Sequence, residues 1–228
     1  MYYASERALG ARVERATEAL WVTYRWMTLG LATTGLVALG VASSRDALEL
    51  ILGNRLVFFG LIIAQLGLVV SFGAAARRAS TAVVAAMFFA YAALTGVTFS
   101  TLFLLYTASS IGGVFLVTAG AFAGLSAVGF FTKSDLSVIG RFAIFAIVGL
   151  ILASVVNFFL QSSGLHWLVS IAGVLIFGAL TAYDTQKLKH LFASGEVHAN
   201  MPLVGALTLY LDFVNMFLFL LRLFGRRR

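Results

Sequence analysis

The sequence contains no cysteine, one proline and few charged residues, and these shortages exclude several classes of protein. Without cysteine, neither a disulfide framework nor a thiolate metal or redox site can form. Charged residues make up 11% of the 228 residues and apolar residues 61%, with a mean hydropathy of +0.99. A soluble chain of this length could not cover so much apolar surface with so few charges. The three histidines are scattered, so they predict no metal-binding cluster.

The chain has instead a series of apolar runs, each of about 20 residues, which is the length of a membrane-spanning helix. They predict seven spans: Trp21–Ala42, Leu56–Ala76, Thr81–Tyr106, Ile111–Phe131, Arg141–Leu160, Leu165–Phe192 and Met201–Phe224. The connections are short, so we expect an all-α polytopic membrane protein with one compact seven-helix bundle over residues 21–225. Residues 1–20 predict an amphipathic cytoplasmic segment, and residues 226–228 form a basic tail.

The net charge of +7 comes from Lys and Arg at the ends of the apolar runs, where they determine membrane topology. No compact basic face interleaved with aromatic residues is present, so we expect no nucleic-acid partner. The distribution places the N-terminus and the even-numbered connections in the cytoplasm. The three arginines of the tail conflict with this if seven spans cross. The last segment therefore either crosses, as its length favours, or is re-entrant, as charge counting favours; we favour seven crossings.

One carboxylate, Asp212, lies in the middle of the last apolar run. A charge at bilayer depth costs about 2.5 to 3.5 kcal/mol, so such residues usually face the protein interior and serve a function. Gly205, Thr208 and Asn215 share its helical face. This small and polar stripe predicts an ion, proton or gating site. The alternative is a structural stripe whose hydrogen bonds hold helices together.

A second carboxylate, Asp184, is predicted to lie at nearly the same depth as Asp212. The turn between the last two spans is expected at Ala193–Asn200, opened by Gly195 and closed by Pro202. Asp184 lies 8 residues before the end of one span and Asp212 11 residues after the start of the next. At about 1.5 Å per residue, the depths are about 12 and 16 Å. Local pairing of Asp184 with a lysine, Lys187, is the alternative.

A pair of carboxylates in a site of low dielectric has predictable chemistry. The two groups cannot both ionise cheaply, so they tend to share a proton and to respond to pH. A hard cation such as Ca²⁺ can replace the proton, which makes Asp184 and Asp212 possible Ca²⁺ ligands. A nearby arginine would stabilise the ionised form and could latch the bundle closed. Arg77 and Arg78 end the second span on the predicted side, although plain topology anchors are the alternative, above all for Arg77.

Four segments resemble a known family. The stretch Leu209–Gly225, LYLDFVNMFLFLLRLFG, is similar to the signature end of the Bax inhibitor 1 family, the transmembrane Bax inhibitor motif proteins. Three further segments agree with it in order: Thr95–Thr98, Phe130–Ser137 and Tyr183–Lys189. The resemblance covers nearly the whole chain from Trp21 onward. The short tails and compact loops favour a bacterial member, in the inner (cell) membrane.

The resemblance implies a seven-helix fold with the last helix central and a pH-sensitive calcium leak. It assigns the gate to Asp184 and Asp212 and the latch to Arg78 in preference to Arg77. Arg222 matches the arginine near the end of the seventh helix. An acidic partner for that arginine would be sought in the second span, where Gln65 is the only strongly polar candidate.

Three classes of function therefore compete. We favour a calcium leak, which needs protons, Ca²⁺ and the lipid bilayer as partners and no cofactor. The alternative is a regulator of a membrane-bound AAA protease or of a cell-death or stress pathway, which would depend more on Tyr2–Ala19. An enzyme is least favoured, because no nucleophile–base pair, ligand cluster or phosphate-binding loop is present. Lys133 and Asp135 predict a loop turn and a helix N-cap rather than a catalytic pair.

Overall fold

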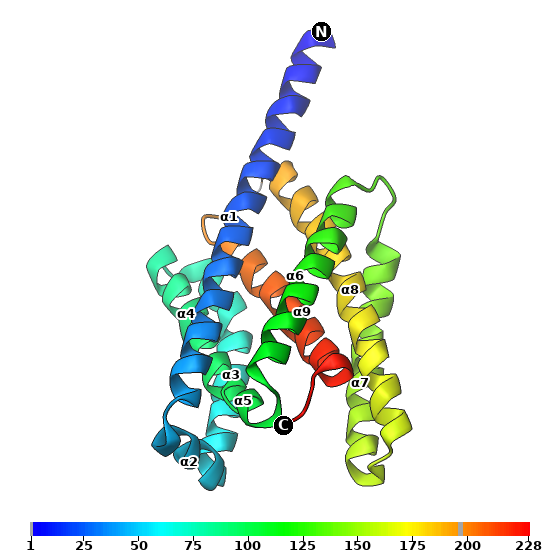
Figure 1. Cartoon of the computed structure of the whole chain (residues 1–228). Coiled ribbons are helices and arrows are strands. Elements are labelled where there is room, and N and C mark those ends of the chain that lie inside the picture. The colour runs from blue at the N-terminus through cyan, green and yellow to red at the C-terminus, as the bar shows by residue number, and fades with distance from the viewer. Residues whose placement is uncertain (1, 196–197) are drawn as a thin grey trace. The chain divides into compact units, whose positions relative to one another are not determined.

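The structure, a computed structural model, describes residues 2–195 and 198–228, without the side chains of residues 2–9 and 11. Met1 of the predicted N-terminal segment, and Glu196 and Val197 of the predicted Ala193–Asn200 turn, lie outside the described residues. The helices are α1 (Tyr2–Ala42), α2 (Arg45–Gly53), α3 (Arg55–Arg78), α4 (Thr81–Phe99), α5 (Leu102–Leu105), α6 (Ala108–Phe131), α7 (Ser137–Leu160), α8 (Ser163–Ser194) and α9 (Met201–Phe224) (Figure 1).

Seven segments of the described chain are long and apolar enough to cross a membrane. They are Arg12–Ala42, Arg55–Arg78, Thr81–Leu105, Ala108–Phe131, Ser137–Leu160, Ser163–Ser194 and Met201–Phe224. The prediction of an all-α polytopic membrane protein is confirmed. The predicted N-terminal segment is the first part of α1 and not a separate helix, because no glycine or proline break separates it from the first span.

A short helix, α2, lies between the first two spans and was not predicted. Its 9 residues are too few to register as an apolar run. Ser44 begins it by accepting a hydrogen bond from the backbone N–H of Ala47, and Asn54 begins α3 in the same way through the N–H groups of Leu56 and Val57. Such caps satisfy amide groups that have no partner within the first turn of a helix.

The described residues group into two compact units. The first unit contains residues 2–105, 191–195, 198–210 and 228, and the second contains residues 106–190 and 211–227. Helix α9 therefore contributes its first half to one unit and its second half to the other. It is also the most buried span, with 67% of its most apolar stretch buried, against 6% for α3.

In the first unit, α1, α4 and α9 meet around one hydroxyl cluster. The Thr34 hydroxyl lies 2.7 Å from the Tyr210 hydroxyl and donates to the Ala92 carbonyl oxygen at 2.9 Å. The Tyr210 ring packs edge-on against Phe88 at 6.0 Å. A Cβ atom at Gly96 would lie 2.6 Å from the Thr34 carbonyl oxygen, so α1 and α4 approach this closely only because that residue is glycine.

In the second unit, two glycines let α6 and α7 pack directly against α8. A Cβ atom at Gly129 of α6 would overlap the backbone carbonyl of Ala182. A Cβ atom at Gly140 of α7 would lie 2.5 Å from the ring of Tyr183. Both contacts fall on the residues immediately before Asp184, so they fix the position of α8 at that level.

The connection between α6 and α7 is also bonded to α8. The Gln186 side-chain amide donates to the Ser134 carbonyl oxygen at 2.8 Å and accepts from the Leu136 N–H at 2.9 Å. One turn further, the Lys189 ammonium donates to the Phe130 carbonyl oxygen at 2.6 Å. Because Gln186 is 4% exposed, these bonds are shielded from water and hold the loop firmly.

Asp135, predicted as a helix N-cap, lies in this loop. Helix α7 begins two residues later, at Ser137, whose backbone N–H donates to the Asp135 carboxylate at 2.9 Å. Hydrogen bonds from the side chain and then the backbone of Ser137 lower the pKa of Asp135 below its ordinary value. Asp135 thus caps the start of α7, although the cap position itself is occupied by Leu136.

Hydrogen bonds within each unit show which ends of the second, third and seventh spans lie on the same side of the protein. In the second unit, the Thr107 N–H, after the third span, donates to the carbonyl oxygen of Arg226, after the seventh. In the first unit, the Asn200 side chain, before the seventh span, donates to carbonyl oxygens of Ala76 and Ala79 at the end of the second. Helix α9 is unbroken over 24 residues, about 36 Å, which exceeds a hydrocarbon core of about 30 Å. These observations favour seven crossings over a re-entrant last segment; the orientation of the N-terminus stays a prediction.

We expect Gly129→Ala to destabilise the protein by about 1 to 3 kcal/mol, because the added methyl group meets backbone atoms of α8 that cannot rotate away. Thermal unfolding in detergent micelles measures this. Gly124→Ala, in the same helix with nothing within 4 Å of its Cβ position, is the matched control and should leave the midpoint unchanged or raise it. Equal midpoints for the two variants would contradict the packing argument.

Candidate gating site

The structure brings Asp184 and Asp212 together. They lie on α8 and α9, consecutive helices joined by a short connection, and both belong to the second unit. The two carboxyl groups lie close enough to interact with each other directly. Asp184 is 9% exposed and Asp212 is 4% exposed. The two depths counted along the sequence therefore correspond to one site, while the role of the pair as a gate stays a prediction.

A hydrogen bond between two carboxyl groups requires a proton, since two ionised carboxylates are both acceptors. The second oxygen of Asp212, Oδ2, is buried and has no hydrogen-bond partner in the described part of the chain. A buried acceptor of this kind is costly unless a proton, a cation or water satisfies it. The Oδ2 atom of Asp212 therefore needs a proton, a cation or water as its partner.

The alternative partner of Asp184 was Lys187. Its side chain is exposed, and its ammonium lies 5.7 Å from the centre of the Tyr183 ring. That cation–π contact directs the lysine along the helix surface. The charge of Lys187 still acts on the carboxyl group of Asp184, which also interacts with Asp212 in the interior of the unit.

The two supporting polar residues of α9, Thr208 and Asn215, bond to their own helix. Thr208 donates to the Val204 carbonyl oxygen at 3.1 Å, and Asn215 donates to the Leu211 carbonyl oxygen at 2.8 Å. Both side chains are half-buried. They share the face of Asp212, as predicted, but their donors are used locally.

An aromatic cluster surrounds Phe213, the residue that follows Asp212 on α9. Phe213 lies edge-on to Phe115 at 5.3 Å and to Phe122 at 5.5 Å, all within the second unit. Phe213 and Phe122 are nearly inaccessible to solvent. This packing buries the residue that follows Asp212, and Asp212 itself is 4% exposed, so the dielectric around its carboxyl group is low.

The three predicted arginines are exposed. Arg77 and Arg78 are exposed in the last turn of α3, in the first unit, so the choice of latch stays a prediction. Arg222 lies 10 residues after Asp212 on α9, about 15 Å along the axis. Its guanidinium stacks 5.2 Å from the centre of the Phe219 ring.

Gln65, considered as a partner for Arg222, bonds within the first unit. Its amide donates to the Thr98 hydroxyl at 2.7 Å and accepts from the Thr95 hydroxyl at 3.5 Å. These threonines begin and end one of the four segments that carry the resemblance. The segment therefore serves to join α3 to α4.

The pair could bind Ca²⁺ only weakly by itself. Two carboxyl groups supply at most four oxygens, whereas Ca²⁺ takes about six to eight. No group of three or more His, Cys, Asp or Glu residues suited to a metal ion occurs among the described residues. The pair by itself therefore supplies fewer oxygen ligands than a Ca²⁺ ion usually takes.

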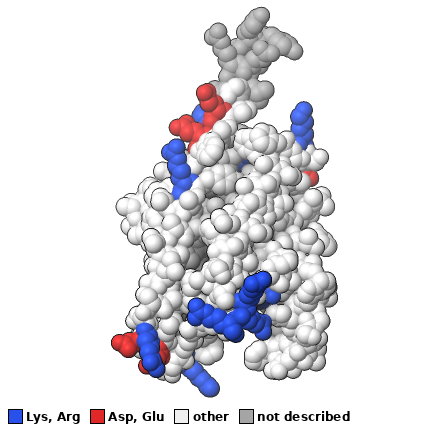
Figure 2. Space-filling view, viewed as in Figure 1, with Lys and Arg blue, Asp and Glu red and all other residues white. Residues whose placement is uncertain are grey.

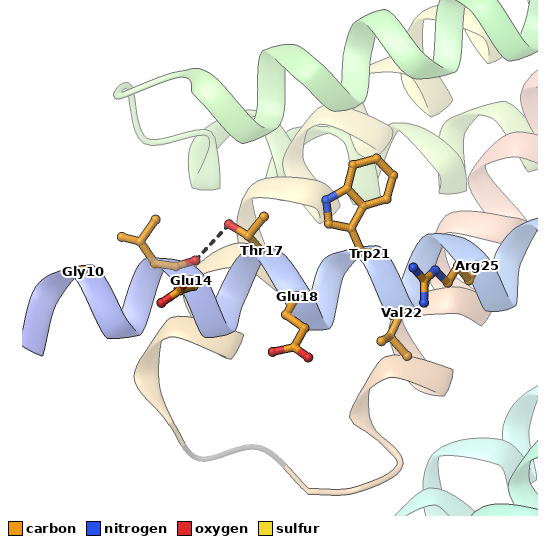
Figure 3. Close-up of a pocket in the computed structure, with 8 residues that line it drawn as sticks. Gly10, Glu14, Thr17, Glu18, Trp21, Val22 and Arg25 are labelled. Carbon is orange, nitrogen blue, oxygen red and sulfur yellow. Dashed lines mark hydrogen bonds between the residues drawn. The ribbon is translucent and has the colours of Figure 1, made fainter.

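The segment on which the regulator hypothesis depends carries a surface hollow (Figure 3). Its lining residues, which include Glu14, Glu18, Trp21 and Arg25, all come from α1. A hollow with walls from a single helix is surface relief and not an enclosed site.

Sequence reasoning missed the residues that hold Asp184 in place: Gly129, Gly140, Gln186 and Lys189. The sequence did contain a pattern from which some of these contacts could have been predicted. Gln186 and Lys189 belong to the Tyr183–Lys189 segment, and their partners Phe130, Ser134 and Leu136 belong to the Phe130–Ser137 segment. Two segments that carry the same resemblance could have been predicted to touch.

Comparison with known proteins extends the resemblance over the chain. The family model described as "Inhibitor of apoptosis-promoting Bax1" matches residues 18–228. Inner membrane protein YbhL of Escherichia coli K12 is 48% identical over 210 residues, which cover 90% of each chain. An uncharacterized protein of Borreliella burgdorferi is 42% identical over 206 residues, 89% of each chain. An uncharacterized membrane protein of Streptococcus pyogenes is 34% identical over 183 residues, 79% of this chain and 80% of the relative.

The match spans every membrane helix, and the relatives are bacterial proteins, two of them named as membrane proteins. The chain belongs to the Bax inhibitor 1 family.

Proposed function

We propose that this multi-pass membrane protein conducts calcium ions down their gradient, and that the Asp184–Asp212 pair gates the pathway in response to pH. The observation that carries the proposal is the contact between two buried carboxyl groups on neighbouring helices. Conduction is passive in this proposal, with no catalytic step and no cofactor. The name of YbhL supports a place in the bacterial inner membrane, and the charge distribution supports a cytoplasmic N-terminus.

Protonation changes the charge of the pair and hence its attraction for a cationic latch. With both carboxyl groups ionised, the pair attracts an arginine strongly and the bundle stays closed. A shared proton removes one negative charge, so the attraction weakens and the pathway opens. The pair lies close to the point where α9 passes from the first unit to the second, after Tyr210. A change in charge there can alter the packing of both halves of the helix.

We expect calcium flux into reconstituted vesicles to rise as the pH falls from about 8 to about 6, because a shared proton then removes one of the two negative charges of the pair. A calcium-sensitive dye inside the vesicles measures the flux, and protein-free vesicles are the control. Flux that is absent at every pH would contradict the proposal and favour the regulator.

Asp184→Asn and Asp212→Asn should each reduce the pH dependence of the flux, because neither single variant retains two groups that compete for a proton. If the residues form one coupled pair, the double variant should differ from the sum of the single effects by about 0.5 to 3 kcal/mol. The exposed Asp46→Asn is the matched control and should keep the native profile. Additive effects would show that the two carboxyl groups act separately.

Arg78→Ala should raise the basal flux at pH 8 by about fivefold or more, which corresponds to the lower end of usual coupling free energies. Arg77→Ala removes the same charge from the neighbouring position and should change the flux less. The comparison at one pH isolates the latch from the proton. If the effects are exchanged, Arg77 is the latch; if both variants keep the native flux, neither arginine has this role.

A further inference from the structure

A polar cavity lies in the second unit, away from the aspartate pair. It has a volume of about 660 Å³ and is lined by Arg222, Arg227, His166, Asn157 and Gln161 among other residues. These residues come from the end of α7, the start of α8 and the end of α9 and its tail. The cavity therefore lies where three spans end, at the level of the membrane surface.

The cavity is cationic. No acidic side chain lines it, and Arg222 and Arg227 form no ion pair within the described part of the chain. Figure 2 shows a group of Lys and Arg side chains, with no Asp or Glu among them, near the C-terminal residues of Figure 1. Two guanidinium groups beside one cavity repel each other, so an anion between them would be stabilised.

The donors of the cavity are free to bind a ligand. The flat face of the Arg222 guanidinium group packs on the Phe219 ring. The N–H groups point outward in the plane of the guanidinium and remain available as donors. The Nε2 atom of His166 is buried without a hydrogen-bond partner in the described residues. The oxygen of Asn157 accepts the Ser162 N–H at 3.1 Å, so its NH₂ group remains as a donor.

The helix α8 adds a further positive contribution, because its first turn begins at Ser163 on the wall of the cavity. The N-terminus of a 32-residue helix carries a partial positive charge and amide groups without partners inside the helix. Compensation of the α9 dipole explains Arg222 alone, and topology anchoring does not explain Arg227, because the tail arginines conflict with seven crossings. Neither explains why both arginines line the same cavity together with an unpartnered histidine nitrogen.

We propose that the cavity formed by Arg222, Arg227 and His166 binds a phosphate-bearing anion. A tetrahedral oxyanion accepts several hydrogen bonds at once, and guanidinium groups bind it in a bidentate manner. The volume accommodates an anion larger than a halide. Two sources supply this chemistry at a membrane surface: the headgroup of an anionic phospholipid and free phosphate in solution.

The test begins with inorganic phosphate, titrated by calorimetry into the purified full chain in a phosphate-free detergent. Arg222→Gln and Arg227→Gln should each weaken binding about tenfold or more, since each removes charged hydrogen bonds. Arg226→Gln is the matched control. It removes the same charge one position away from Arg227, from an exposed residue that does not line the cavity, and should change the affinity less than about twofold.

The second arm identifies the source of the anion. The chain is reconstituted in nanodiscs of phosphatidylcholine with a minor fraction of phosphatidylglycerol, and the lipids retained after detergent extraction are measured by mass spectrometry. Retention of phosphatidylglycerol that is lost in Arg222→Gln and Arg227→Gln shows a lipid headgroup site. Phosphate binding without such retention shows a site for the free anion.

Two results would overturn the inference. One is that neither inorganic phosphate nor phosphatidylglycerol binds the native chain. The other is that Arg226→Gln weakens binding as much as Arg222→Gln and Arg227→Gln, which would indicate general surface charge and not a site. His166→Gln provides a further check, because it keeps a donor and should retain more affinity than His166→Phe. All of these readouts are independent of calcium flux, so failure here leaves the gate untouched.

Discussion

The contact between two buried carboxyl groups, Asp184 and Asp212, constrains the rest of the structure more than any other interaction. Two carboxylates cannot be held together in a site of low dielectric unless a proton or a cation neutralises part of their charge. The burial of the pair increases that demand. Asp212 is 4% exposed, and its Oδ2 atom has no hydrogen-bond partner among the described residues.

The surrounding structure holds one member of the pair more tightly than the other. Asp184 follows two residues that touch glycines of α6 and α7, and Gln186 bonds α8 to the loop between those helices. On α9, Thr208 and Asn215 bond only to their own helix, and Tyr210, two residues before Asp212, bonds Thr34 within the first unit. Within the second unit, Asp184 therefore has more polar restraints beside it than Asp212 has.

Much of this arrangement follows from patterns within single segments. The seven spans follow from hydropathy, and the shared depth of Asp184 and Asp212 follows from counting residues on either side of one turn. Gly195 ends α8 with a φ of 84°, as expected for a glycine that closes a helix. These features depend on local chemistry and on the rise of a helix, which the sequence specifies directly.

Other features depend on which faces of distant helices meet, and a single sequence does not specify that. The division into two units was not predicted, because α9 is one continuous apolar run with no sign of a boundary after Tyr210. The close contacts of Gly129 and Gly140 were hidden among 22 glycines, of which many have open space at the Cβ position. The role of Gln186 required knowledge of the loop that it bonds.

Arg222 matches the family pattern, but this chain has no acidic residue in the second span to pair with it. The resemblance led us to seek an acidic partner in the second span, and the only strongly polar residue there, Gln65, bonds Thr95 and Thr98 instead. Arg222 lines a cavity without carboxylates, next to a second arginine. A guanidinium group near a membrane surface needs a counter-charge, and if the chain does not supply one, an external anion can. Such an anion would bind to the same helix as Asp212, about 15 Å from it, and beside the start of the helix that carries Asp184, so the two sites would share both α8 and α9.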